Sequence, residues 1–244
     1  MIEAEDLLKR YLASLSKNHP ERGAVEALLK SAQAHNAKPE QVTDGITTET
    51  DPNKEWRRQA ENLASLFAEP LDMSRGEYVE KLPQFPDKPQ EYEGILDIPV
   101  IVQPPQLGLS LSRILDIAGI NYDSQAISGF EDWERSGFKT PRRPYTTWLD
   151  DGSRFLGKTV EVARDGLASF ERGGTHADGI GLYLKDPNIL KAHYLDFPGS
   201  QFGSGSAPFL VLDGDEPWLL RYWVGSPDRR FGSVVAGREI RVGA

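Results

Sequence analysis

Apolar residues recur every three or four positions through most of the first 70 residues, which is the spacing of amphipathic helices. The pattern predicts helices over residues 2–16, 20–35 and 53–68. The residues expected to face inward in the third helix are Trp56, Ala60, Leu63 and either Leu66 or Phe67. Residues 36–53 are polar and rich in Thr, Asp and Pro, which predicts a linker before the third helix. Pro70 is expected to end that helix.

The pattern changes after residue 94. Short apolar or alternating runs predict strands over residues 95–102, 180–185, 209–212, 217–224 and 231–242. The sequence Asp-Gly-Asp-Glu at 213–216 is expected to form the turn of a hairpin between the third and fourth of these strands. A helix is predicted over residues 106–117, with Gly119 as its stop.

A further helix is predicted between residues 155 and 170. Its apolar stripe consists of Phe155, Leu156, Thr159, Val160, Ala163, Leu167 and Phe170. Asp150 or Ser153 is expected to cap its first turn, because either side chain can accept hydrogen bonds from free N–H groups there. Gly173 and Gly174 are expected to end it, since glycine readily adopts the left-handed conformation of a helix stop.

Glycine and proline divide the chain into three parts. Only four of the 23 glycines lie in the first 100 residues, so the N-terminal part is helical and the C-terminal part rich in turns. Prolines among charged residues indicate an extended connector between them. We therefore predict an α+β protein with a helical N-terminal part (1–80), a proline-rich connector (81–94) and a mixed or antiparallel sheet domain with packed helices (95–244).

Composition excludes several classes of site. The chain has no cysteine, so disulfides, thiolate nucleophiles and cysteine-ligated zinc are excluded. No apolar run approaches the roughly 20 residues that span a bilayer, and the acidic start MIEAEDLLKR is unlike a signal peptide. A soluble, cytoplasmic protein that does not contact membranes is the expectation.

A net charge of −9 disfavours a broad nucleic-acid surface, which needs positive charge. A local basic patch stays open, because the central region contains Arg142, Arg143, Arg154, Lys158, Arg164 and Arg172. The phosphate-binding loops of common nucleotide folds are missing after the strand at 95–102, and no G-x-S-x-G nucleophile motif is present.

The densest group of ionisable residues follows the helix predicted over 155–170. Within eight residues the chain places Glu171, Arg172, Thr175, His176 and Asp178, with two glycines between them and a third, Gly179, directly after. Acid/base chemistry could use Glu171 or Asp178 with His176, while Arg172 holds an anion. The other interpretation is structural, because polar turn residues usually satisfy nearby backbone groups.

A second group is formed by His193 and Asp196. Together with Arg172 and Thr175 these are the predicted ligand-binding residues. Two histidines and two carboxylates could in principle hold a metal, but the spacing matches no known ligand pattern, so no metal site is predicted and the cofactor is left undetermined. The aromatic residues between 130 and 148 are expected to pack in the core, with a stacking pocket as the alternative.

Part of the chain resembles an uncharacterised family of bacterial proteins. The matching positions are Trp148, Asp151-Gly152, Lys158, Arg164, Leu167, Glu171-Arg172, Asp178-Gly179-Ile180, His193, Asp196 and Pro198-Gly199. The resemblance covers roughly residues 144–235 and implies no activity.

The function predicted from these observations is that of a soluble bacterial binding or interaction protein. Its N-terminal helices would contact a partner protein, and the region rich in aromatic residues and glycine could hold a small molecule. The alternative is an enzyme that acts on an anionic small molecule by acid/base chemistry at residues 171–178.

Overall fold

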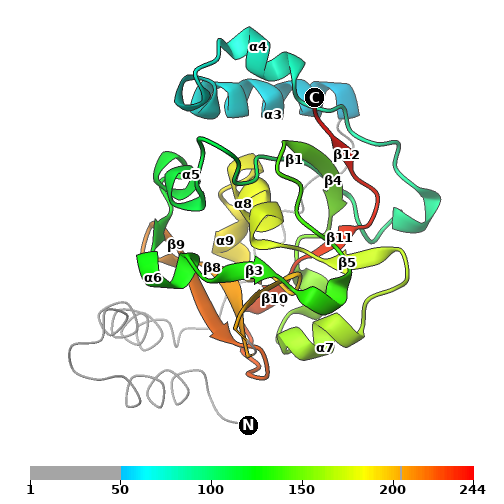
Figure 1. Cartoon of the computed structure of the whole chain (residues 1–244). Coiled ribbons are helices and arrows are strands. Elements are labelled where there is room, and N and C mark those ends of the chain that lie inside the picture. The colour runs from blue at the N-terminus through cyan, green and yellow to red at the C-terminus, as the bar shows by residue number, and fades with distance from the viewer. Residues whose placement is uncertain (1–50, 204) are drawn as a thin grey trace.

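Two sheets enclose a central helix, and further helices cover the outside (Figure 1). The computed structural model describes residues 51–203 and 205–244. This part of the chain contains helices together with antiparallel and mixed sheets, so the predicted α+β class is confirmed. The helices predicted over 2–16 and 20–35, and the linker except for its last residues, lie outside the described residues.

The first sheet is antiparallel and has the order β1-β4-β11-β5, with β12 beside β4. Its strands are β1 (Ile98–Val102), β4 (Tyr145–Leu149), β5 (Glu171–Gly173), β11 (Val235–Gly237) and β12 (Arg241–Val242). The second sheet has the order β10-β6-β8-β7-β3, with β9 beside β8 and β2 beside β9. Its strands are β2 (Asn121–Tyr122), β3 (Phe130–Asp132), β6 (Tyr194–Asp196), β7 (Ser200–Phe202), β8 (Ser206–Asp213), β9 (Glu216–Trp223) and β10 (Phe231–Ser233).

The helices lie between the sheets and around them. They are α3 (Pro52–Phe67), α4 (Arg75–Glu80), α5 (Leu111–Ala118), α6 (Ser124–Ile127), α7 (Val160–Asp165), α8 (His176–Lys185) and α9 (Ile189–Ala192). Short 3-10 turns are η1 (Glu69–Leu71), η2 (Gln90–Tyr92), η3 (Glu134–Ser136) and η4 (Ser153–Phe155). One hydrophobic core runs from α3 through both sheets to β11.

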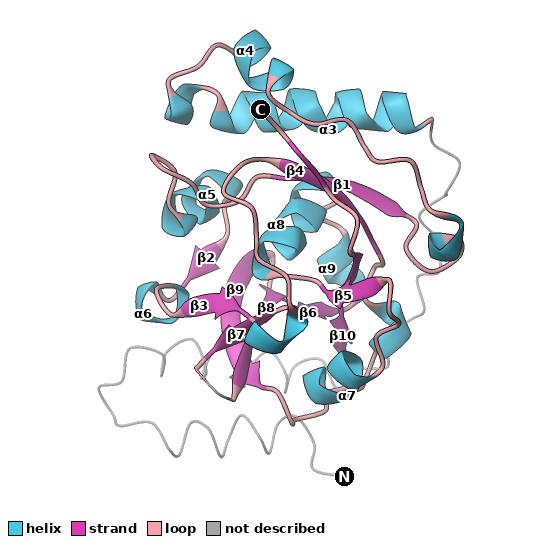
Figure 2. Cartoon of the chain, turned by 45° about the vertical axis from the view of Figure 1, so that its right-hand side comes forward, coloured by secondary structure: helices cyan, strands magenta, loops and turns pink. Residues whose placement is uncertain are grey.

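The predicted third helix is confirmed as α3, which lies across the first sheet beside β1 (Figure 2). Asp51 caps it by accepting a hydrogen bond from Asn53 N. Gln59 of α3 also closes the free edge of β1, because its side chain donates to Pro99 O and accepts from Ile101 N, both at 2.8 Å. An edge strand with unpaired backbone groups invites association, so this amide protects the edge while fixing the helix on the sheet.

Several other predicted elements are confirmed. The first apolar run forms β1, and the helix stop at Gly119 has a φ of 67°. The hairpin forms from β8 and β9, which pair from Ser206 with Trp223 to Asp213 with Glu216. The C-terminal run forms three short strands, and the chain passes from the second sheet to the first at Val234, between β10 and β11.

The helix predicted over residues 155–170 is wrong in its extent. Only α7 is helical within this region, and Thr159 caps it rather than Asp150 or Ser153. The turn η4 precedes it, and Gly157 has a φ of 75°, which a helix does not accept. Leu156, expected in the apolar stripe, is therefore exposed.

The strand predicted over residues 180–185 is also wrong, since these residues belong to α8. Gly173 does not end a helix but lies in β5. The alternating apolar residues predicted a strand because α8 is buried on every side from His176 to Leu182. It therefore lacks the polar face by which a helix is normally detected. Gly179 and Gly181 allow this burial: a Cβ at Gly179 would lie 1.9 Å from the ring of Phe197.

Candidate functional site

The polar residues of 171–178 connect β5 to the start of α8, between the two sheets. Thr175 caps α8 by accepting a hydrogen bond from Asp178 N at 3.2 Å. The Asp178 carboxylate in turn accepts from Thr175 N at 2.7 Å, which completes a reciprocal capping box. Thr175 and Asp178, three residues apart, therefore fix where the central helix begins.

Asp178 and Arg172 form an ion pair with no exposed side-chain surface. Arg172 Nη1 lies 2.5 Å from Asp178 Oδ2, and Nη2 lies 3.1 Å from Oδ1. Tyr145 of β4 donates to Asp178 Oδ1 at 2.8 Å, and the Thr175 hydroxyl donates to Oδ2 at 2.9 Å. Burial opposes ionisation of Asp178, but Arg172 and these donors hold its pKa below the ordinary value.

The remaining groups of Arg172 are also engaged inside the protein. Its Nε donates to Gly237 O at 3.1 Å, and Nη1 donates to Gly173 O at 3.4 Å. The ring of Phe138 covers the guanidinium at 3.8 Å. Burial lowers the pKa of Arg172, but the charge of Asp178 outweighs it and raises that pKa above the ordinary value. Arg172 thus joins β5, α8 and β11, and it has no surface to offer an external anion.

His176 has partners other than this ion pair. Its Nδ1 lies 2.9 Å from Ser200 Oγ, which also accepts a hydrogen bond from His176 N at 3.0 Å. The imidazole contacts the ring of Phe130, with centroids 5.9 Å apart. Burial lowers the pKa of His176, against the opposing charges of Asp132 and Asp178. Ser200 is completely buried, so the pair ties β7 to α8 and does not present a nucleophile to solvent.

Glu171 belongs to a third set of contacts, which includes Arg154 of η4. Its Oε1 lies 2.6 Å from Arg154 Nη1, and its Oε2 accepts from Ala168 N at 2.8 Å. Asp150 accepts from Val235 N at 2.7 Å and lies 3.9 Å from Arg154 Nε. Burial raises the pKa of Asp150 to about 7, because these contacts compensate only in part for lost hydration.

The structure does not bring His193 and Asp196 into hydrogen-bonding contact with 171–178 among the residues it describes. His193 Nε2 lies 2.7 Å from Asp151 O. Asp196 is buried at the end of β6, and its Oδ1 has no hydrogen-bond partner. Burial, together with the charge of Asp228, raises the pKa of Asp196 well above its ordinary value. The predicted site residues are therefore divided among several separate sets of contacts.

Sequence reasoning missed the partners that decide these roles. Tyr145 and Ser200 lie 33 and 24 residues from the side chains they bind, and no local pattern marks them. Sequence reasoning assigned no contact to Arg164, which donates to Pro198 O and Ser200 O, both at 2.9 Å, and lies over the ring of Trp133. Within residues 51–203 and 205–244 no group of three or more His, Cys, Asp or Glu residues could hold a metal ion.

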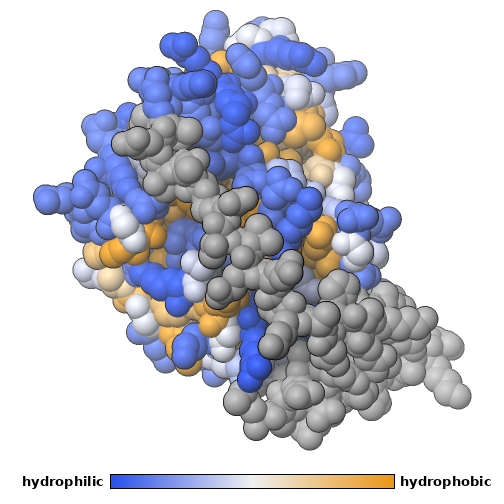
Figure 3. All heavy atoms as spheres, turned by 180° about the vertical axis from the view of Figure 1, so that it is seen from behind, coloured by the Kyte–Doolittle hydropathy of each residue, from blue (hydrophilic) through white to orange (hydrophobic). Residues whose placement is uncertain are grey.

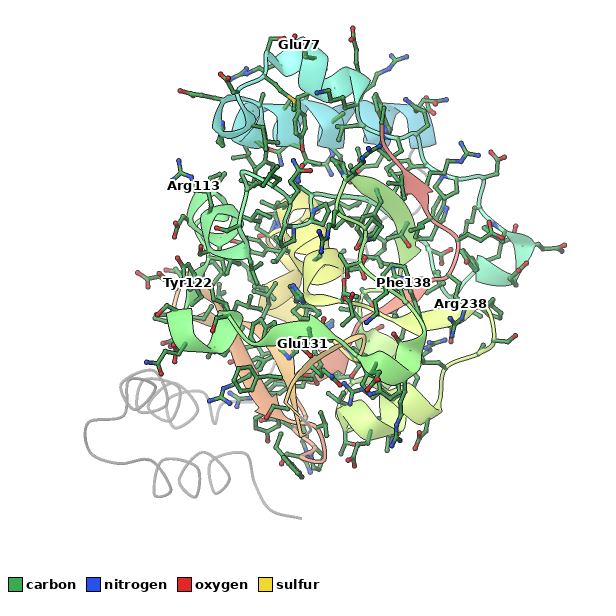
Figure 4. The ribbon with its side chains drawn as sticks, viewed as in Figure 1. Glu77, Arg113, Tyr122, Glu131, Phe138 and Arg238 are labelled. Carbon is green, nitrogen blue, oxygen red and sulfur yellow. The ribbon has the colours of Figure 1, made fainter. Side chains whose placement is uncertain are left out.

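A strap of residues 133–144 crosses the front of the molecule after β3 (Figure 4). Its inward side is fixed, because Trp133 N donates to Gly199 O and Phe138 covers Arg172. Thr140 donates to Asp132 through both N and Oγ1. Its outward side carries four exposed basic residues that form no ion pair with any described residue, namely Arg135, Lys139, Arg142 and Arg143.

Comparison with known proteins adds no identification. No family model, no curated protein and no solved structure matches the chain. In the described part of the chain, no helix is both long and apolar enough to traverse a bilayer. The resemblance of residues 144–235 to a bacterial family stays a prediction.

Proposed function

We propose that this chain is a binding protein that contacts an acidic segment of a partner protein through the strap of residues 133–144. The observation that carries the proposal is the set of four exposed basic side chains on the strap that form no ion pair with the described residues, against one acidic residue there, Glu134. The chain as a whole has a net charge of −9, so this positive surface runs against its average. Fixed charges of one sign attract and orient a partner of the opposite sign.

The anchoring of the strap supports a binding role. Cation–π contacts hold Trp133 against the half-buried Arg164 and Phe138 against the buried Arg172, with distances of 4.3 and 3.8 Å. Asp132 and Thr140 close the base of the strap. A segment fixed in this way loses little conformational entropy when it binds, which favours affinity.

The exposed apolar residues give less support to a binding surface than the basic residues of the strap do. The exposed large hydrophobic residues come from separate segments: Ile95, Leu107, Leu156, Val162, Trp223 and Val242. Seen from behind, apolar side chains reach the surface in several places between hydrophilic ones (Figure 3). Isolated apolar residues of this kind are normal on soluble proteins.

The enzyme hypothesis has less support than the binding hypothesis. It requires Arg172 to hold an anion near His176 and a carboxylate. Arg172 has no exposed side-chain surface and already binds Asp178, while His176 is bonded to a buried serine. Acid/base groups must reach the proton they transfer, and the hydrogen-bond partners of Arg172, His176 and Asp178 are other buried groups of the protein.

The test is titration of a fluorescent octaglutamate peptide into the full chain at low salt, followed by fluorescence anisotropy. In the variant Arg142→Glu/Arg143→Glu we expect affinity to fall about tenfold or more, because attraction becomes repulsion. Arg57→Glu/Arg75→Glu is the matched control. It changes net charge equally at exposed residues of α3 and α4, and we expect less than about a twofold effect.

Equal losses in both variants would show that only net charge matters, and the proposal would then be wrong. A single-stranded oligonucleotide serves as a second ligand in the same assay. Tighter binding of the oligonucleotide than of the peptide, lost in the strap variant, would assign the strap to nucleic acid instead.

A further inference from the structure

The sequence contains five Asp–Gly pairs, a dipeptide that can modify itself. The glycine nitrogen attacks the side-chain carboxyl of the aspartate, so that a bond forms from Gly N to Asp Cγ. The N–H proton and the carboxyl OH leave together as water, and a succinimide ring results. A second water can then break the bond between the main-chain carbonyl of the aspartate and the nitrogen, giving OH to the carbonyl carbon and a proton to the nitrogen. The product is isoaspartate, whose side-chain carbon has become part of the backbone.

Four of these pairs lie in the described residues, and they can be compared directly. They are Asp151–Gly152, Asp165–Gly166, Asp178–Gly179 and Asp213–Gly214. The fifth pair, Asp44–Gly45, lies outside the described residues and does not enter the comparison. The reaction sets two conditions on the glycine. Its N–H must be free to give up the proton, and its peptide plane must have room to rotate towards the carboxyl group.

The first condition separates Gly214 from the other three glycines. Gly152 N donates to a side-chain oxygen of Asp150 at 3.1 Å. Gly166 N donates to two carbonyl oxygens of α7, at 3.0 and 3.2 Å, and Gly179 N donates to the carbonyl oxygen of the residue that caps α8, at 3.0 Å. Gly214 N donates to none of the residues that the structure describes. Only at Gly214, within the four pairs, is the nucleophile therefore available without breaking a hydrogen bond.

The second condition gives the same order. A Cβ added to Gly179 would overlap an aromatic ring, and at Gly166 it would lie 3.0 Å from one. At Gly152 it would lie 3.1 Å from a main-chain oxygen, whereas at Gly214 nothing lies within 4 Å. The peptide plane of Gly214 thus has room to turn, while the other three are enclosed by packed neighbours.

The position of Asp213–Gly214 in the fold explains both observations. Asp213 pairs with Glu216, so Gly214 and Asp215 form the two-residue turn at the tip of the β8–β9 hairpin. Gly214 has a φ of 62°, and both turn residues are exposed to water. Exposed tips open at lower free energy than helices packed in a core. The turn therefore offers the mobility and the water that the reaction needs.

We infer that Asp213–Gly214 is the self-modification site among the described Asp–Gly pairs, and that isoaspartate forms there in the folded protein. The change adds one carbon to the backbone of a two-residue turn and leaves the net charge unaltered. Because such a turn fixes how its strands pair, the longer backbone should disturb the pairing of Asp213 with Glu216. The inference is independent of partner binding by the strap.

The test is incubation of the full chain at neutral pH in H₂¹⁸O, followed by digestion in ordinary water and mass spectrometry of the separated peptides. Ring opening incorporates one heavy oxygen, so labelled peptides report the reaction at each pair. We expect at least about tenfold more product at Asp213 than at Asp151, Asp165 or Asp178, because those pairs must first open locally. In concentrated urea the fold no longer protects any pair, and the four products should agree within about threefold.

Two variants assign the product to its residue. Asp213→Glu keeps the charge but lengthens the side chain, so that a strained approach to a larger ring is required, and the product at this pair should be lost. Asp165→Glu is the matched change at a protected pair and should leave the product at Asp213 unaltered. Equal products at the four pairs of the folded chain would overturn the inference. So would the same ranking in urea as in the folded chain, or no product at Asp213 over a period that labels the pairs in urea.

Discussion

Asp178 and Asp196 are both buried carboxyl groups, but their surroundings shift their pKa values in opposite directions. Asp178 accepts hydrogen bonds from Arg172, Tyr145 and Thr175, and its pKa is lowered. Asp196 has an Oδ1 without a partner, and its pKa is raised well above the ordinary value. Folding therefore favours the ionised form of Asp178 and the neutral form of Asp196.

The difference shows that burial of an ionisable residue does not by itself indicate a functional site. Asp178 occupies the start of the central helix, where its charge stabilises the N-terminal turn and fixes Arg172. Asp196 lies at the end of β6, opposite Ser233, whose Oγ is also without a partner. Both carboxylate oxygens of Asp178 accept hydrogen bonds, whereas Asp196 Oδ1 and Ser233 Oγ have no hydrogen-bond partner.

The largest expected effect follows from neutralising Asp178. Asp178→Asn would leave Arg172 as a buried charge without its counter-ion, at a cost of about 3–5 kcal/mol of unfolding free energy. Urea denaturation at pH 7 measures this loss. Asp165→Asn, on the exposed side of α7, is the control and should change stability by less than about 0.5 kcal/mol. A loss from Asp178→Asn as small as that of the control would contradict the structural role of the pair.

Much of the fold was predicted because its signals are local. The apolar spacing of α3, the stop at Gly119 and the turn at Gly214 each depend on residues a few positions apart. The two wrong predictions, the helix over 155–170 and the strand over 180–185, failed because of backbone conformation and packing in the folded protein. Gly157 has a positive φ that ends one helix pattern, and Gly179 permits a close approach to Phe197 that hides another.

The sequence marked residues 171–178 as a group of polar side chains but did not show their roles. Arg172, Thr175, His176 and Asp178 are buried and hydrogen-bonded. Whether such a group binds a ligand or holds the fold depends on partners distant in sequence, such as Tyr145 for Asp178 and Ser200 for His176. No spacing rule within residues 171–178 could have supplied them.

A smaller effect, and one of opposite sign, is expected for Asp196→Asn. Because the folded pKa of Asp196 is raised, the folded state retains a proton that the unfolded chain releases above about pH 3.9. The bound proton of Asp196 therefore contributes to the free energy of unfolding of the wild type. This contribution is fully present below that value and is lost as pH rises towards the folded pKa. The asparagine variant removes this loss. Relative to wild type it should gain up to about 1.4 kcal/mol per pH unit within the window.

Urea unfolding of both proteins at several pH values between 4 and 8 measures the difference. At pH 4 the two should agree within about 1 kcal/mol, since both side chains are then neutral and of similar shape. Asp178 has a lowered pKa, so its contribution has the opposite dependence and is lost only as pH falls through that folded value. A difference between Asp196→Asn and wild type that stayed constant with pH would mean that Asp196 is ionised in the native protein.

The smallest effect separates the cap of α8 from its ion pair. Thr175→Ala removes the hydroxyl that accepts from Asp178 N and donates to its carboxylate, but leaves Arg172 paired. We expect a loss of about 1–2 kcal/mol, within the usual range for an N-cap. Thr175→Ser keeps the hydroxyl and should recover most of it in the same urea experiment. If alanine cost as much as Asp178→Asn, the hydroxyl and not Arg172 would be the main support of the buried carboxylate.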